Sequence, residues 1–229
     1  MRKINFSNNE YYHIYNRGVD KRDVFLDEND YLRFLDNLKT FNNNSTHDQR
    51  IYIKNKSLQG AAELSSEASE LSSVTTNLND FLGSLPKLVE IICYCLNPNH
   101  FHLIMRQLVD SGIEKFMHKL GTGYTNFFNL EHHRSGALFQ GPFKATQVTS
   151  FEYLLWLSIY VNTNAQIHGI TDNAADYPWC SYPAYLGIKA DNICNKNILL
   201  DEVQNYKTIA EDTAKFMKMK KEMEKFILD

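Results

Sequence analysis

The triplet His100-Phe101-His102 contains the residues of this chain best suited to metal chemistry. In an extended strand, residues i and i+2 project from the same face, so the two imidazoles are expected side by side. Neutral imidazoles that converge on one point bind divalent cations. Because short motifs also occur by chance, a pair of hydrogen-bonded histidines without a metal is the alternative that this triplet leaves open.

A second polar pair, Tyr160 and Asn164, lies in an apolar segment that predicts a helix over residues 151–166. A spacing of four puts both on one helix face. A tyrosine hydroxyl beside a two-histidine metal site is a candidate nucleophile toward phosphate, and the Asn164 carbonyl oxygen is a candidate third ligand. The apolar helix alone would instead make Tyr160 a core residue, as we expect for Trp156. Tyr124 is a rival nucleophile, but its regular apolar stripe favours packing.

The elements that must position these residues are strands and helices in alternation. Aromatic and β-branched runs predict strands, and an Asn-Pro-Asn turn joins two of them into a hairpin. Segments with helical periodicity of apolar residues lie between and after these runs. The predicted strands are 11–15, 51–53, 89–95 and 100–105, and the predicted helices are 27–41, 113–128, 151–166 and, as one helix or two, 199–228. This order predicts an α+β fold, an antiparallel sheet with helices packed on it.

Residues 57–84 differ in composition from the rest of the chain, since Ser, Ala, Glu, Thr and Asn dominate there. Leucines recur every seventh residue from 64 to 85, which is compatible with a short coiled-coil arm. The small polar residues between them favour a solvated insertion instead. We therefore expect a domain over 1–187 that carries a low-complexity insertion at about 57–84, followed by a helical extension at 188–229.

Composition excludes several classes of protein. The 229 residues are 43% hydrophobic, which permits a sizeable core. No apolar run approaches the ~20 residues of a membrane-spanning helix, and the first residues do not resemble a secretory signal. Four cysteines without a Cys-x-x-Cys pair favour a reducing, cytoplasmic setting. The net charge of −3 does not by itself indicate nucleic-acid binding.

Five short segments follow a family pattern when they are taken in order along the chain. They are Tyr-His-Ile-Tyr-Asn-Arg-Gly (12–18), Cys-Leu-Asn-Pro-Asn-His-Phe-His-Leu-Ile (95–104), Arg-Ser-Gly-Ala-Leu-Phe-Gln-Gly-Pro-Phe-Lys-Ala (134–145), Tyr-Val-Asn-Thr-Asn (160–164) and Tyr-Pro-Trp-Cys-Ser-Tyr (177–182). Together they resemble the HUH single-tyrosine transposases of the insertion-sequence type, and most closely their REP-associated tyrosine transposase relatives. The resemblance spans most of residues 11–187.

The resemblance implies a ferredoxin-like fold of the HUH endonuclease type, with His100 and His102 as metal ligands, Tyr160 as nucleophile and Asn164 beside the metal. Such proteins use Mg²⁺ or Mn²⁺ to cut single-stranded DNA next to a hairpin, and they form a 5′-phosphotyrosine link and a free 3′-OH. We therefore expect an enzyme of DNA transposition and recombination whose partner is single-stranded or hairpin DNA. It would act as a monomer or homodimer, with Tyr160 serving its own chain or a partner's.

Four polar side chains are the expected DNA contacts. Phosphate contacts dominate affinity for nucleic acids, and the candidates are Arg17, Arg134 and Lys144. Gln140 is a candidate for a base edge or for capping a turn. For the three cations, solvated surface charge is the alternative.

Three departures from the family pattern concern this site. Asn97 stands where the family commonly has Met, Ala165-Gln166 stand for Pro-Val, and Pro142 stands for an Arg that would add a cation. Two other functions therefore stay open: a domesticated protein that binds hairpin nucleic acid without cutting it, and an unrelated metal-dependent hydrolase. The complete set of two His, Tyr and Asn favours retained cleavage, and the hydrolase would leave the Tyr160 helix unexplained.

Overall fold

The computed structural model of the protein describes residues 4–43 and 86–228. The described strands form one four-stranded sheet in the order β2-β3-β1-β4, and every neighbouring pair is antiparallel. The strands are β1 (Tyr11–Arg17), β2 (Val89–Asn97), β3 (His100–Gln107) and β4 (Lys144–Val148). Helix Glu28–Thr40 lies between β1 and β2 and helix Gly112–Glu131 lies between β3 and β4, and this order of the described elements is the ferredoxin-like topology. The predicted α+β class is confirmed.

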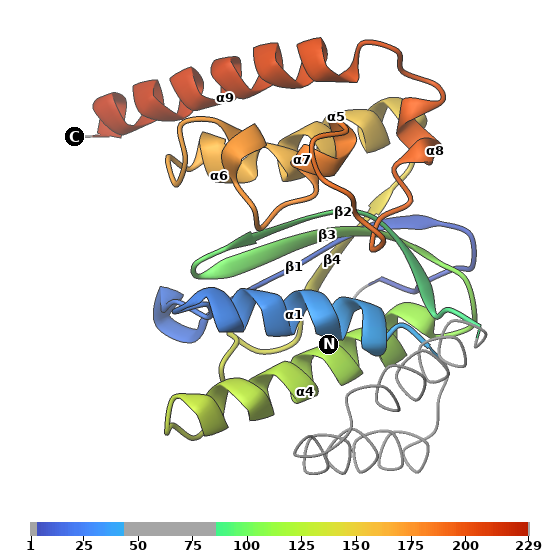
Figure 1. The fold of residues 1–229 in the computed structure, drawn as a ribbon, viewed down its shortest axis with the longest axis vertical. Helices are drawn as coiled ribbons and strands as arrows, with labels where there is room; N and C mark the ends of the chain where they lie inside the picture. Colours follow the sequence, from blue (N-terminus) through green and yellow to red (C-terminus); the bar gives the residue numbers. More distant parts are fainter. Residues whose placement is uncertain (1–3, 44–85, 229) are drawn as a thin grey trace, which may run out of the picture.

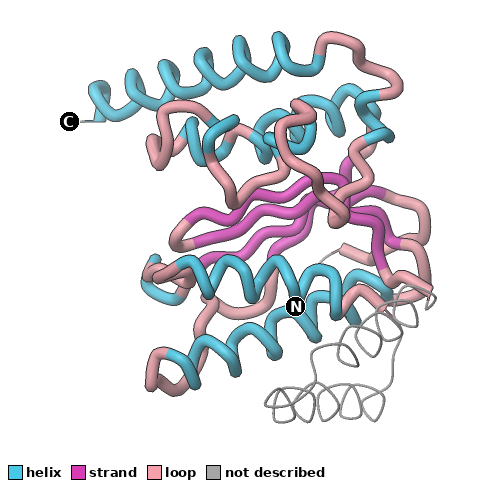
Figure 2. Tube along the Cα trace, in the orientation of Figure 1, coloured by secondary structure: helices cyan, strands magenta, loops and turns pink. Residues whose placement is uncertain are grey.

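Helices cover both faces of the sheet (Figure 1). On one face lie α1 (Glu28–Thr40) and α4 (Gly112–Glu131), which pack on each other. On the other lie α5 (Phe151–Asn162) and α6 (Asn164–Ile167), and α9 (Tyr206–Leu228) packs outside these two (Figure 2). The remaining short helices of the described residues are η1 (Val19–Lys21), η2 (Ala174–Asp176), α7 (Tyr182–Tyr185) and α8 (Asn197–Leu200).

Several predictions fall on residues that the structure does not describe. The strand at 51–53 and the insertion at about 57–84 lie outside the described residues. The division at residue 187 stays a prediction as well. None of the described helices is long and apolar enough to cross a membrane.

The helix expected over 151–166 is divided at Thr163. Its start is as predicted, because the Ser150 side chain accepts the Tyr153 N–H and caps α5. The Thr163 hydroxyl donates to the Ile159 carbonyl at 2.8 Å, and Thr163 has φ −101° and ψ 9°. A threonine that bonds back to the preceding turn competes with the regular helix ladder. Tyr160 and Asn164 therefore belong to consecutive helices, α5 and α6, rather than to one.

One apolar core lies on each side of the sheet, and Tyr124 belongs to one of them. This residue is fully buried in the core under α1 and α4. Its hydroxyl donates to the Val24 carbonyl at 2.6 Å, and burial raises the pKa of Tyr124 well above its ordinary value. Tyr124 is thus a packing residue with a satisfied hydroxyl, as its apolar stripe indicates.

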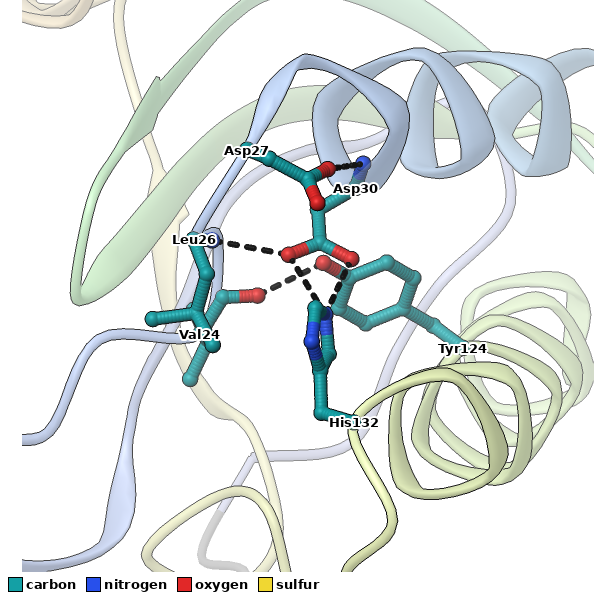
Figure 3. A network of polar contacts seen from close by, with 6 residues as sticks. All are labelled: Val24, Leu26, Asp27, Asp30, Tyr124 and His132. Carbon is teal, nitrogen blue, oxygen red and sulfur yellow. Dashed lines mark hydrogen bonds and ion pairs between the residues drawn. The ribbon is translucent and has the colours of Figure 1, made fainter.

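A buried polar clasp joins the start of α1 to the end of α4 (Figure 3). The Asp30 carboxylate is fully buried and accepts from His132 Nε2, which lies 2.9 and 3.0 Å from its two oxygens. One of these oxygens also accepts the Leu26 N–H at 2.7 Å. Asp27 caps α1 by accepting the Asp30 N–H at 3.1 Å. The clasp therefore fixes the two helices on one face of the sheet relative to each other.

Replacing His132 by Ala is expected to lower the free energy of unfolding by about 1–3 kcal/mol, because the buried Asp30 carboxylate loses a hydrogen-bond donor. Urea denaturation measures the change. His118→Ala, at an exposed position of α4, is the control and should stay within about 0.5 kcal/mol of the parent protein. Equal losses in the two variants would show that the clasp contributes nothing of its own.

Candidate metal and nucleic-acid site

The two predicted metal ligands project from one face of β3 toward α5. The rings of His100 and His102 are 5.2 Å apart, edge to face, and the ring of His102 lies 5.8 Å from that of Tyr160. Phe101 points to the opposite face, where its ring packs 5.1 Å from Phe34. The alternation that the sequence predicts for this strand is confirmed, and it brings the imidazoles to the nucleophile candidate.

A second set of side chains orients both imidazoles through Nδ1. Asn99 Oδ1 accepts from His100 Nδ1 at 2.6 Å, and His13 Nε2 lies 2.9 Å from His102 Nδ1. Because Nδ1 is engaged in both rings, Nε2 is the atom that each presents as a ligand. His13 was missed at the sequence level, although it lies in β1, which pairs directly with β3. Only the register of that pairing brings it to His102.

Burial keeps these imidazoles neutral. It lowers the pKa of His13 to about 4 and that of His100 to about 4, with His168 nearby adding to the effect on His100. Burial also lowers the pKa of His102 well below its ordinary value, and His13 and His100 contribute. A cationic imidazole repels a metal ion, whereas a neutral one offers a lone pair. At neutral pH the cluster is therefore in the form that binds cations.

Tyr160 is half-buried and stacks on Trp156, one turn earlier in α5. The two rings are 5.9 Å apart and almost parallel, at 3°. Trp156 is 47% exposed, so the expectation that it lies in the core is wrong. The reason is that the outer side of α5 is not wholly covered at this point, which hydrophobicity alone does not reveal. The result is a flat aromatic surface next to the candidate nucleophile.

Asn164 lies beside the histidine pair but is fully buried. Its Oδ1 accepts from Asn97 Nδ2 at 2.5 Å, and the same Asn97 nitrogen lies 2.9 Å from His100 Nε2. The other amide atom of Asn164, Nδ2, is buried without a hydrogen-bond partner among the described residues. An amide oxygen suits hard ions such as Mg²⁺ and Mn²⁺, and neutral imidazole nitrogens also bind divalent cations. These residues therefore fit the divalent ion that the resemblance implies.

A pocket of about 280 Å³ opens at the histidines and Tyr160. Its lining residues are Tyr15, Asn16, Arg17, His100, Phe101, His102, Gln140, Lys144, Tyr160 and His168. The pocket therefore combines the histidine pair, the tyrosine and three of the four predicted DNA contacts. Arg17 and Lys144 are exposed there, so both cations are accessible to an anion.

Arg134 does not line this pocket. Its guanidinium lies 5.5 Å from the ring of Phe128, near the end of α4, and it donates to the Ala137 carbonyl at 3.3 Å. Arg134 is half-buried. A role for it in DNA binding stays a prediction, at a place separate from the histidines.

Helix α9 adds a cation that the motifs did not indicate. Lys221 Nζ lies 2.7 Å from His168 Nδ1, and the ring of His168 lies 5.3 Å from that of His100. An ammonium can only donate, so the His168 Nδ1 accepts and the neutral ring carries its proton on Nε2. Sequence reasoning missed both residues, because more than fifty positions separate them.

The described residues also include one group of three acidic and histidine side chains whose ligand atoms are close enough to share an ion, namely Asp27, Asp30 and His132. This is the clasp of Figure 3, on the α1 and α4 face of the sheet. The Asp30 carboxylate already accepts from His132 and a backbone N–H, and Asp27 caps α1. We interpret the group as structural.

Comparisons with known proteins give a finding at the level of structure. No family model matches the chain, and no curated protein matches it in sequence. A solved structure of a REP-associated tyrosine transposase bound to a REP hairpin resembles this one at 11% sequence identity, with a TM-score of 0.48. The likeness covers 85% of this chain and 93% of that one.

Proposed function

We propose that this protein is a metal-dependent single-stranded DNA nuclease or transposase that cuts next to hairpin DNA through a 5′-phosphotyrosine intermediate. The observation that carries the proposal is the meeting of Tyr160 with the His100 and His102 pair in one pocket, beside Asn164. Arg17 and Lys144 in the same pocket suit a polyanionic substrate.

The pocket residues and the buried Asn164 have separate parts in the reaction. His100, His102 and Asn164 would hold the ion, which supplies Lewis-acid polarisation of the scissile phosphate when bound. The Tyr160 oxygen attacks phosphorus and loses its proton, while the bond from phosphorus to the 3′ oxygen breaks and that oxygen gains a proton. The products are a 5′-phosphotyrosine ester and a free 3′-OH. Because the ester keeps the bond energy, the strand can be rejoined without an external energy source.

The position of Tyr160 in the structure favours its role as nucleophile. It lies on a helix, where a rigid backbone limits the positions that the hydroxyl samples. Trp156 stacks on the Tyr160 ring, and the ring of His102 lies 5.8 Å from it, edge to face. A nucleophile held near its target avoids much of the entropic cost of a bimolecular reaction.

The test is the formation of a covalent adduct with DNA. A hairpin oligonucleotide with a single-stranded flank is incubated with the protein and Mn²⁺, and the products are separated on a denaturing gel. An oligonucleotide labelled at its 3′ end should become attached to the protein, whereas one labelled at its 5′ end should give a shorter free fragment. EDTA should prevent both. If hairpins bind but no oligonucleotide gives an adduct, the protein is a non-cleaving hairpin binder and the proposal fails.

The exposed ring of Trp156 is proposed to stack on an unpaired base of the DNA flank, as aromatic side chains do in proteins that bind single strands. Trp156→Ala is expected to weaken binding of the flanked hairpin about 10-fold, because stacking of one base on an aromatic ring contributes ~1–3 kcal/mol to the binding free energy. Trp156→Phe should retain most of the affinity. Fluorescence anisotropy in EDTA measures binding without cleavage.

Phe216→Ala is the matched control, since it removes another exposed aromatic ring, on α9. It should leave the affinity unchanged, and blunt duplex without a flank should bind the parent protein and Trp156→Ala equally. If Trp156→Ala lost as much affinity for blunt duplex as for the flanked hairpin, the substitution would perturb the protein in general and Trp156 would not stack on a base of the flank.

A further inference from the structure

Asn97, the last residue of β2, lies at the centre of the proposed metal site. It is fully buried, and it faces His100 across the end of the hairpin in the β2–β3 register. Its Nδ2 donates to Asn164 Oδ1 at 2.5 Å and lies 2.9 Å from His100 Nε2. Asn97, one of the departures from the family pattern, therefore contacts two of the three proposed ligands.

The hydrogen bonds define which atoms carry lone pairs. Asn99 Oδ1 can only accept, so His100 Nδ1 carries the proton and His100 Nε2 has the lone pair. The two hydrogens of the Asn97 amide nitrogen then meet two acceptors, His100 Nε2 and Asn164 Oδ1. In this arrangement the NH₂ group satisfies the same two lone pairs that a cation would use.

The separations match those between ligands of one ion. Ions such as Mg²⁺ bind oxygen at about 2.0–2.1 Å in octahedral geometry, so neighbouring ligands lie about 3 Å apart. The Asn97 amide nitrogen is 2.5 and 2.9 Å from the two ligand atoms. One arm of the Asn97 amide therefore occupies a place that suits a further ligand, although a neutral amide nitrogen has no lone pair to offer.

Reversal of the amide sacrifices little at its oxygen, and a bound ion would take over the two acceptors that the NH₂ group serves. Its Oδ1 accepts only a weak hydrogen bond in this arrangement, from Cys95 Sγ at 3.5 Å. A half-turn about the last side-chain bond exchanges the two amide arms, since oxygen and nitrogen have nearly the same size. The exchange puts a carbonyl oxygen beside His100 Nε2 and Asn164 Oδ1.

We propose that Asn97 is a fourth protein ligand of the divalent ion, and that its amide turns from donor to acceptor when the ion binds. This inference rests on the proposed function, because it assumes the ion at His100 and His102. The site then consists of two imidazole nitrogens and two amide oxygens. Without the ion, the Asn97 NH₂ group holds His100 and Asn164 in place.

The test compares the Mn²⁺ affinity of three full-length variants with that of the parent protein by calorimetry. Asn97→Met, which installs the family residue, removes the amide oxygen and should weaken binding at least 10-fold. Asn97→Asp supplies a carboxylate oxygen without NH₂ hydrogens and should strengthen it at least 10-fold. Asn126→Met, at an exposed position of α4, is the matched control and should bind like the parent protein. Thermal melts verify that each variant is folded.

Nitrogen NMR of the histidine rings gives a readout that does not depend on activity. In the parent protein without metal, the resonance of His100 Nε2 should report a hydrogen-bonded acceptor, and this bond should vanish in Asn97→Met. If Asn97→Met binds Mn²⁺ as tightly as the parent protein or more tightly, Asn97 is not a ligand and the inference is wrong. The DNA adduct would still form in that case, which separates this failure from failure of the proposed function.

Discussion

Tyr160→Phe is expected to reduce the covalent DNA adduct to less than about a thousandth of the level of the parent protein, since it removes the only atom that attacks phosphorus. Binding of the flanked hairpin should change little, because the ring and its stacking on Trp156 remain. The adduct is measured on denaturing gels with 3′-labelled hairpin DNA and Mn²⁺, and binding is measured by anisotropy in EDTA.

Two other tyrosines make this experiment discriminating. Tyr11→Phe is the matched control, because Tyr11 lies at the far end of β1 from the histidines and is half-buried like Tyr160. It should form the adduct normally. Tyr124→Phe removes the rival hydroxyl, which is buried and donates to the Val24 carbonyl. Persistence of the adduct in Tyr160→Phe, with loss in Tyr124→Phe, would transfer the role of nucleophile to Tyr124.

Loss of Mn²⁺ binding is the result expected when His100 and His102 are both replaced by Ala. Removing even the groups that orient metal ligands typically costs 10–100-fold in affinity, so we expect loss of two ligands to weaken binding by more than about 100-fold. Calorimetry on the full chain measures this at neutral pH, where burial keeps both imidazoles neutral. Adduct formation should vanish in the same variant.

The control for this variant is His118→Ala, an exposed histidine on the opposite side of the sheet. It should bind Mn²⁺ with the affinity of the parent protein. A second variant, His132→Ala, tests the clasp of Asp27, Asp30 and His132, which also has its ligand atoms close together. If Mn²⁺ binding survives the double substitution but is lost in His132→Ala, the ion belongs to the clasp and the proposed site is misplaced.

Local patterns predicted the α+β class and three of the four described strands, but no predicted strand covers β4 (Lys144–Val148). Alternating residues in β3 put both histidines on one face and Phe101 on the other, because side chains of a strand point to opposite sides in turn. The two-residue turn between Asn97 and His100 made the hairpin recognisable. The regular apolar stripe of α4 also predicted the burial of Tyr124.

Local patterns were less informative where a residue depends on distant neighbours. The back-bonding hydroxyl of Thr163 divides the helix between Tyr160 and Asn164, and an apolar segment gives little sign of such a break. Trp156 is apolar and was expected in the core, but whether a helix face is covered depends on elements elsewhere in the chain. Exposure is a property of the packed molecule.

The sequence by itself determined which chemistry the chain offers: a histidine pair on a strand, a tyrosine and an asparagine four residues apart, and nearby cations. These follow from residue types and from periodicities that any strand or helix imposes. Only the tertiary structure decided which of them meet. It brought His13 to His102 through the β1–β3 register, Asn97 to Asn164 through the packing of α6 on β2, and Lys221 to His168 through α9. The physical reason is that such contacts join residues tens of positions apart, and their geometry is set by the packing of whole elements.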